Sequence, residues 1–169
     1  AMSLAVLRIL GIDLPARDLM EGFAPLPHRC EHAGAIDGVV YVDDSKGTNV
    51  AASVTAMTSL EGRKVVILGG RGKGEDYAPL AEAVVREADA AGLLGEERDA
   101  IADALRRAGF SAIHMAKDME GAVLAARDLA RPGMTVLLSP ACTSWDMYAN
   151  YGERGDHFRS IVRGLKVEP

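Results

Sequence analysis

The sequence predicts an α/β domain of Rossmann-like type, with a mostly parallel sheet and helices on both of its faces. Short apolar runs of strand length recur along the chain, and amphipathic segments with helical spacing separate them. No internal repeat or low-complexity tract competes with this alternation. Such βαβα order is typical of parallel sheets covered by helices, so we expect that architecture.

Length and composition agree with one ordinary domain. The chain has 169 residues, and 49% of them are hydrophobic, which is enough for a real core. The formal net charge is -5 and the isoelectric point is near 5.4, so no basic surface is expected to bind nucleic acid or an anionic membrane. The two cysteines lack metal-site or disulfide-framework spacing. We therefore expect a cytoplasmic protein.

Three parts of the chain are expected. Residues 1–21 contain a short apolar helix and read as the tail of an earlier domain. Residues 22–27, with two prolines, form a candidate linker. Residues 28–169 form the α/β domain itself.

Within that domain, two strands around a turn at 35–38 should form an opening hairpin over residues 28–42. Helices are predicted where apolar residues recur at helical spacing. One such stripe contains Val50, Val54, Met57 and Leu60, and the other contains Ile101, Leu105 and Ala108, with Gly109 as a terminator. The remaining strands are expected at 38–43, 65–68, 89–95, 111–116 and 135–140.

Three polar loops follow predicted strands, and in an open α/β sheet ligands bind at that edge. They are residues 43–49 (DDSKGTN), 69–76 (GGRGKGED) and 139–146 (SPACTSWD). Lys46 and Lys73 supply positive charge, so the loops together suit a polyanion or a dicarboxylate. Hydroxyl donors are supplied by Thr48, Ser139, Thr143 and Ser144. The alternative is that Thr48 and Ser144 only cap helices and that the lysines are solvated.

Familiar nucleotide motifs are missing from these loops. Around Lys73, Ile67 stands where a P-loop has its first glycine, and Gly74 stands where it has Ser or Thr. A dinucleotide fingerprint fails as well, because Glu75 occupies the position of its third glycine. The chain alone is therefore not expected to bind ATP phosphates in the usual way.

The three loops, in this order and with the YGERGDHF segment behind them, resemble the signature loops of the D-glutamate-adding members of the Mur ligase family. The residues LPHR at 26–29 match the family's domain junction, and the resemblance covers about residues 22–165. It implies the C-terminal domain of a three-domain ligase, inactive alone. The UDP-sugar domain and nearly all of the central P-loop ATPase domain are then expected to lie outside this chain.

The resemblance implies roles for particular residues. Arg29 and Asp44 would contact the nucleotide's base or ribose, and Lys46 would act catalytically on phosphate and acyl-phosphate oxygens. The D-glutamate carboxylates would be held by Thr48, Lys73, Ser144, the backbone at Trp145, and Tyr151. Three positions depart from the family pattern: Trp145 replaces an aliphatic residue, Tyr151 replaces Phe, and Asp43 replaces a neutral amide.

The implied ligands are ATP, D-glutamate and UDP-N-acetylmuramoyl-L-alanine, with Mg²⁺ held mainly by the central domain, and a monomer is expected. The same fold occurs in other Mur ligases and in folylpolyglutamate synthetases, which remain alternatives. A stand-alone Rossmann-type nucleotide-binding regulatory module is a further alternative, against which the failed dinucleotide fingerprint argues.

Some other side chains invite different interpretations. His28, Cys30 and His32 would share a face of one strand, which suggests a metal, but an ordinary strand is the better prediction and no metal site is expected. Cys142 lacks a base partner and is expected to be a buried structural thiol. Trp145 and Tyr148 could stack on a base, although packing is the more usual role of such aromatics.

Overall fold

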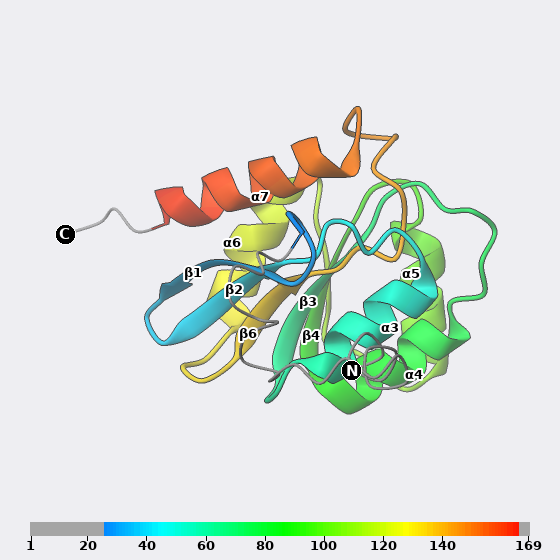
Figure 1. Ribbon diagram of the computed structural model, residues 1–169. Helices are drawn as coiled ribbons and strands as arrows, with labels where there is room; N and C mark the ends of the chain where they lie inside the picture. The colour runs from blue at the N-terminus through cyan, green and yellow to red at the C-terminus, as the bar shows by residue number, and fades with distance from the viewer. Residues whose placement is uncertain (1–25, 166–169) are drawn as a thin grey trace, which may run out of the picture.

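A computed structural model of the protein describes residues 26–165. The predicted helical tail, residues 1–21, and most of the predicted linker, residues 22–27, lie outside the described residues. The described part forms one six-stranded sheet in the order β1-β2-β6-β3-β4-β5, and its layers are visible in Figure 1. All neighbouring strands are parallel except β1 and β2, which are antiparallel. The predicted fold class is confirmed.

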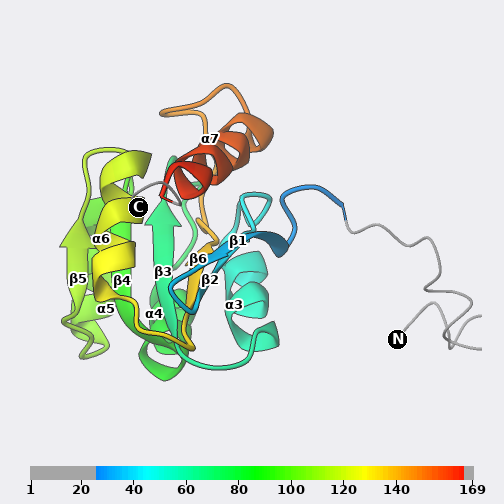
Figure 2. The ribbon, with the colours of Figure 1, turned by 90° about the vertical axis from the view of Figure 1, so that its left-hand side faces the viewer.

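The strands match the predicted apolar runs. They are β1 (Glu31–Ile36), β2 (Val39–Asp43), β3 (Lys64–Gly69), β4 (Ala88–Leu94), β5 (Ile113–Met115) and β6 (Thr135–Leu138). Every residue of β3 is buried, as expected for a strand in the middle of a sheet that is covered on both faces. At the edges lie β1 and β5, on opposite sides of the molecule in Figure 2.

The helices divide between the two faces of the sheet. They are α3 (Val50–Ser59), α4 (Ala78–Glu87), α5 (Arg98–Arg107), α6 (Met119–Leu129) and α7 (Tyr151–Gly164). One core cluster joins α3, α4 and α5 to the sheet, and a second joins α6 and α7 to the other face. Figure 1 shows α7 above the sheet and α3 and α4 below it.

The predicted opening hairpin is confirmed as β1 and β2. Its turn is tighter than predicted, because Asp37 and Gly38 both have positive φ angles, of 51° and 78°. Two successive residues with positive φ are the signature of the hairpin turns that match strand twist, and Asp-Gly is a favoured pair for them. The turn therefore explains why the sheet begins with an antiparallel pair.

Two glycines allow the loop after β3 to leave the sheet. Gly69 and Gly70 have φ angles of 115° and 135°, which side chains rarely adopt. A Cβ atom at Gly69 would collide with the carbonyl of Leu94, and one at Gly70 would collide with the carbonyl of Thr143. Glycine at these positions lets the 69–76 loop pass directly against its neighbours.

Within residues 26–165, no helix combines the length and the apolar character that crossing a membrane requires.

Candidate functional site

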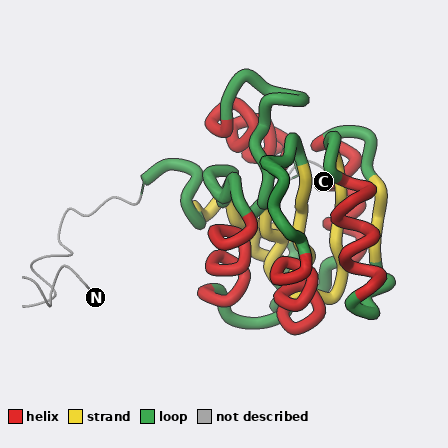
Figure 3. Tube along the Cα trace, turned by 90° about the vertical axis from the view of Figure 1, so that its right-hand side faces the viewer, coloured by secondary structure: helices red, strands yellow, loops and turns green. Residues whose placement is uncertain are grey.

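The loops that follow β2, β3 and β6 are bonded to one another at the carboxyl edge of the sheet, on the side that faces the viewer in Figure 3. Arg71 and Thr143 exchange two backbone hydrogen bonds of 2.9 Å. The Ala141 amide donates to the Gly47 carbonyl, also at 2.9 Å. The predicted convergence of the three loops is therefore confirmed.

The helices after these loops are capped by residues other than Thr48 and Ser144. Asn49 caps α3 through a bond from the Ala52 amide, and Asn150 caps α7. Glu75 adds a second anchor at α3, because its carboxylate accepts from the Val50 amide at 2.9 Å. The idea that Thr48 and Ser144 serve only as caps is thus wrong.

A pocket of about 530 Å³ opens at this edge between the 43–49 loop, α3 and the turn that precedes β1. It gathers all three residues predicted for the nucleotide side, Arg29, Asp44 and Lys46. Thr48 and Tyr151, predicted for the amino-acid side, line the same pocket. The structure therefore places residues from both predicted groups around a single cavity.

Lys46 is held in that pocket by contacts to Tyr151 and to His28. Its ammonium donates to the Tyr151 hydroxyl at 3.0 Å and lies 4.7 Å from the centre of the Tyr151 ring. Its backbone amide donates to the carbonyl of His28, also at 3.0 Å. Tyr151 thus orients the charge of Lys46, a contact that sequence reasoning did not anticipate.

Three predicted site residues do not line the pocket. Lys73 is exposed, Ser144 is 2% exposed, and Trp145 is 65% exposed. The packing role considered for Trp145 is wrong, because its ring faces solvent. Tyr148 does pack against the core, and its hydroxyl lies 2.9 Å from His157 Nδ1.

Arg154, which sequence reasoning missed, ties two of the loops together. It is 2% exposed, and its guanidinium donates to the Ser45 hydroxyl at 2.9 Å, to the Ser45 carbonyl at 2.8 Å and to the Cys142 carbonyl at 3.1 Å. Burial lowers the pKa of Arg154 to about 10, so the group is still charged at neutral pH. Ser45 precedes Lys46, so Arg154 fixes the loop that carries this lysine.

Cys142 is a buried thiol with a hydrogen-bonding neighbour. It is 1% exposed, and its sulfur lies 3.4 Å from the hydroxyl of Tyr77. Burial raises the pKa of the Cys142 thiol to about 11, so the nucleophilic thiolate is scarce at neutral pH. The prediction of a buried structural thiol is confirmed.

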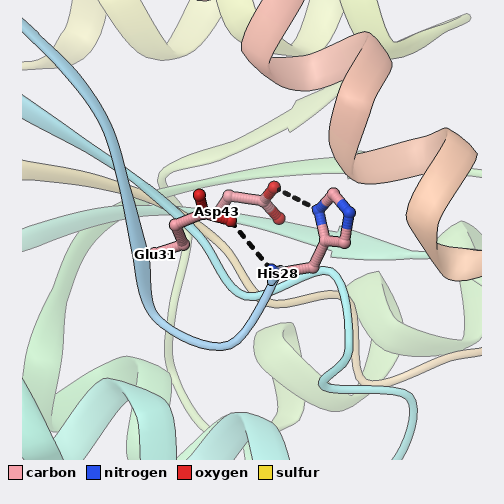
Figure 4. Close-up of side chains that lie close together, drawn as sticks. All are labelled: His28, Glu31 and Asp43. Atoms are coloured by element: carbon pink, nitrogen blue, oxygen red, sulfur yellow. Dashed lines mark hydrogen bonds and ion pairs between the residues drawn. The ribbon is translucent and has the colours of Figure 1, made fainter. Parts of the chain in front are cut away.

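The prediction that His28, Cys30 and His32 share one strand is wrong for His28 and Cys30, and only His32 lies in a strand. The strand begins at Glu31, and His28 and Cys30 have left-handed φ angles of 59° and 45° in the preceding turn. His28 instead turns its buried ring toward β2, and its Nδ1 lies 2.8 Å from Asp43 Oδ2 (Figure 4). That long-range bond holds the turn in place.

His28, Glu31 and Asp43 bring their ligand atoms within 4.8 Å of one another, which invites a metal. Their hydrogen bonds account for the arrangement without one. The Glu31 carboxylate accepts from the His28 amide and from Arg159, and the other oxygen of Asp43 accepts from the Ser45 amide. Because each carboxylate oxygen already has a protein donor, this cluster does not fit a magnesium ion.

Gly155 of α7 provides the space into which His28 packs. A Cβ atom at Gly155 would collide with His28 Nδ1 and lie 2.7 Å from Asp43 Oδ2. We expect Gly155→Ala to lower the free energy of unfolding by about 1 to 3 kcal/mol, the usual cost of overpacking a buried contact. Urea denaturation of the wild-type and variant chains measures it.

Gly164→Ala is the matched control, because a Cβ atom there meets nothing within 4 Å although the residue belongs to the same helix. It is expected to be neutral or slightly stabilising, since alanine favours helix. Equal unfolding midpoints for the two variants would show that the His28 anchor is unimportant.

The fold and the pocket define a class of protein: an α/β domain with a pocket lined by charged and hydroxyl side chains at the carboxyl edge of its sheet. A family model described as "Mur ligase, glutamate ligase domain" matches residues 28–142. The chain therefore belongs to the Mur ligase family and corresponds to its glutamate ligase domain.

Curated relatives agree with this assignment. The UDP-N-acetylmuramoylalanine-D-glutamate ligase of Burkholderia thailandensis is 49% identical over 160 residues, which is 93% of this chain and 32% of the relative. The enzyme of the same name from Burkholderia mallei is 48% identical over the same shares. The chain thus spans about a third of the length of the curated relatives that it matches.

Solved structures share the fold at low sequence identity. UDP-N-acetylmuramate-alanine ligase of Thermotoga maritima gives a TM-score of 0.63 with 16% identity, covering 96% of this chain and 36% of the other. A bifunctional folylpolyglutamate synthase/dihydrofolate synthase of Yersinia pestis gives 0.61 with 16% identity, covering 97% and 37%. A single domain of a Haemophilus ducreyi ligase gives 0.54 with 17% identity, covering 79% and 99%.

Proposed function

We propose that this chain is the amino-acid-binding domain of a ligase that uses ATP to join D-glutamate to UDP-N-acetylmuramoyl-L-alanine in peptidoglycan precursor synthesis. The observation that carries the proposal is the 49% identity to a D-glutamate ligase over 93% of the chain. The pocket supports it independently, because Arg29, Asp44 and Lys46 meet there with Thr48 and Tyr151.

On the nucleotide side, we assign Arg29 to the base or ribose and Asp44 to the ribose hydroxyls. Lys46 faces the phosphate oxygens. The support is that these residues line one pocket, and that the Tyr151 contact keeps the ammonium of Lys46 at its rim. A carboxylate accepts hydrogen bonds from sugar hydroxyls, and an ammonium stabilises phosphate charge, so each residue type suits its assigned ligand atom.

On the amino-acid side, we assign the carboxylates of D-glutamate to Thr48, Lys73, Ser144, the backbone at Trp145, and Tyr151. The 69–76 and 139–146 loops, which carry three of these residues, are hydrogen-bonded to each other through Arg71 and Thr143. Lys73 and Ser144 do not line the pocket, so we place the proposed amino-acid subsite beside it, along these two loops.

The proposed reaction has two steps. ATP first transfers its terminal phosphoryl group to the carboxylate of UDP-N-acetylmuramoyl-L-alanine, which gives an acyl phosphate and ADP. The amine of D-glutamate then attacks the acyl carbon, a C–N bond forms, the C–O bond to phosphate breaks, and the amine proton passes to solvent. Lys46 stabilises the negative charge that develops on the acyl and phosphate oxygens.

The proposal includes the rest of the ligase. Residues 28–169 form this domain, residues 22–27 form the linker, and residues 1–21 form the end of the central ATPase domain, which binds most of the ATP and supplies the ligands of Mg²⁺. The metal would neutralise phosphate charge there, and no step of this domain passes through it. We further propose that the ligase is a cytoplasmic monomer.

Phosphate release by the full-length ligase tests this function. We expect turnover only when ATP, UDP-N-acetylmuramoyl-L-alanine and D-glutamate are all present, and little with L-glutamate, L-alanine or a folate. The 169-residue chain alone is expected to hydrolyse no ATP, because it contains no P-loop. D-glutamate-independent turnover contradicts the proposal, and tight binding of NAD by the chain alone favours the regulatory-module alternative.

A further inference from the structure

Asp44 is a buried residue of the pocket lining, and protein donors hold both of its carboxylate oxygens. It is 5% exposed. Its Oδ2 accepts a hydrogen bond from the hydroxyl of Ser139 at 2.6 Å, and its Oδ1 accepts from the amide of Cys30 at 3.2 Å. The Cys30 thiol lies 3.7 Å from the same Oδ1. The carboxylate is therefore fixed from two sides before any ligand arrives.

Ser139 itself is held by a second serine on α3. Both Ser139 and Ser53 are completely buried, and neither lines the pocket. The Ser53 hydroxyl donates to the carbonyl of Ser139 and accepts from the amide of Ala141, each at 2.9 Å. Ala141 has a left-handed φ of 60°, so these bonds hold the loop in a turn that alanine rarely adopts.

This arrangement links the two sides of the proposed site. Ser139 begins the loop that carries Ser144, which is assigned to D-glutamate, whereas Asp44 is assigned to the nucleotide. The Ser139 hydroxyl is the direct side-chain bond between that loop and the carboxylate. A change in the position of Ser139 is therefore transmitted to Asp44 without passing through the ligands.

The charges and the burial around Asp44 make its hydrogen bond from Ser139 important. Burial raises the pKa of Asp44, and the negative charge of Asp43 acts in the same direction. The bonds from Ser139 and Cys30 oppose this rise because they stabilise the ionised carboxylate. Helix α3 and residues 139–141 contain no ionisable side chain. The titratable and charged groups around the carboxylate are Arg29, Cys30, Asp43, Lys46 and Tyr151.

We propose that Ser139 is a positioning residue that aims the Asp44 carboxylate at the nucleotide, and that Ser53 keeps the Ser139 backbone in place. The Ser53–Ser139 pair thereby couples the amino-acid loop to the nucleotide pocket. The nucleotide assignment rests on the proposed function, whereas the orientation of Asp44 by Ser139 does not.

The first test measures the pKa of Asp44 directly in the 169-residue chain. The carboxyl carbon chemical shift of Asp44 is titrated against pH by NMR in the wild type and in Ser139→Ala. Losing a donor to the ionised form raises the pKa, so the midpoint should move to higher pH, by roughly half a unit to one unit for one such bond. An unchanged or lower midpoint overturns the proposal, whether or not the ligase activity is as proposed.

Ser53→Ala is the comparison variant, because it removes the same atom from an equally buried serine, 3.0 Å from the Ser139 hydroxyl, and keeps the Ser139 donor itself. It should lower the melting temperature and move the Asp44 midpoint in the same direction by clearly less, because Ser53 acts on Asp44 only through Ser139. Equal midpoint shifts in the two variants would mean that general loosening, not the Ser139 donor, controls Asp44. If Ser139→Ala is too unstable to titrate, Ser139→Cys, with a weaker donor, should give a smaller shift in the same direction.

The second test uses the full-length ligase. Ser139→Ala should raise KM for ATP about fivefold to tenfold, the effect of one ordinary hydrogen bond, and change kcat and KM for D-glutamate clearly less. The acid limb of the pH profile of kcat/KM for ATP should move to higher pH, because more Asp44 is protonated at each acidic pH. Equal losses for all substrates with an unmoved acid limb would indicate a purely structural serine and overturn the proposal.

Discussion

Replacing Arg154 with alanine is expected to lower the free energy of unfolding by about 3 kcal/mol. Each lost hydrogen bond to a charged group costs roughly 1.5 to 3 kcal/mol, and part of this loss is offset because the variant no longer buries a cation. The substitution leaves two buried carbonyls, of Ser45 and Cys142, without their donor. Guanidinium chloride denaturation of the 169-residue chain measures the change. Activity of the full-length ligase should also fall, since the Lys46 loop loses its anchor.

Arg163→Ala controls for loss of an arginine from the same helix. Arg163 is exposed and makes no side-chain hydrogen bond or ion pair within residues 26–165. Its removal should change the unfolding midpoint little, as is usual for surface substitutions away from special contacts. If Arg154→Ala unfolds at the same denaturant concentration as Arg163→Ala, Arg154 does not hold the loops together.

Sequence patterns predicted the strands well because each strand is a short apolar run with a local signal at its end. The hairpin was recognisable for the same reason, since Asp37 and Gly38 favour one kind of turn. The helices over residues 78–87, 119–129 and 151–164 were not predicted individually. The caps Asp118 and Asn150 were the local signals that could have located the last two.

Contacts between residues far apart in the chain were not predictable in the same way. His28 looked like a strand residue, yet its conformation is set by Asp43, fifteen residues later. Arg154 binds Ser45 across 109 positions, and Ser139 reaches Asp44 across 95. Contacts over such separations leave no periodic pattern in the sequence. The site loops themselves could be located, because polar residues at strand ends are a local feature.

The different surroundings of the two lysines could not be derived from the loop patterns, which place both in the same kind of polar loop. Only the family resemblance gave the two lysines different expected roles. In the structure, Lys46 lines the pocket and donates to Tyr151, whereas Lys73 is exposed and makes no side-chain hydrogen bond or ion pair within the described residues. A constrained ammonium suits the stabilisation of charge that develops during a reaction. An exposed ammonium such as that of Lys73 suits the binding of a carboxylate that arrives from solvent.

Lys46→Ala in the full-length ligase is expected to lower kcat by roughly a hundredfold to a thousandfold, the usual cost of removing a preorganised group that stabilises developing charge. Its effect on any KM should be smaller. Lys73→Ala should instead raise KM for D-glutamate by about tenfold to a hundredfold, the cost of one charged partner of a carboxylate, and leave KM for ATP nearly unchanged.

Steady-state kinetics with each substrate varied in turn separate these outcomes. Lys117→Ala is the control, because Lys117 is an exposed lysine in the loop before α6, outside the 43–49, 69–76 and 139–146 loops, and its loss should leave all parameters unchanged. The assignment fails if Lys73→Ala impairs every substrate equally. It also fails if Lys46→Ala changes only the affinity for D-glutamate, because a residue acting on the phosphate and acyl oxygens must slow the chemical step even when every substrate is saturating.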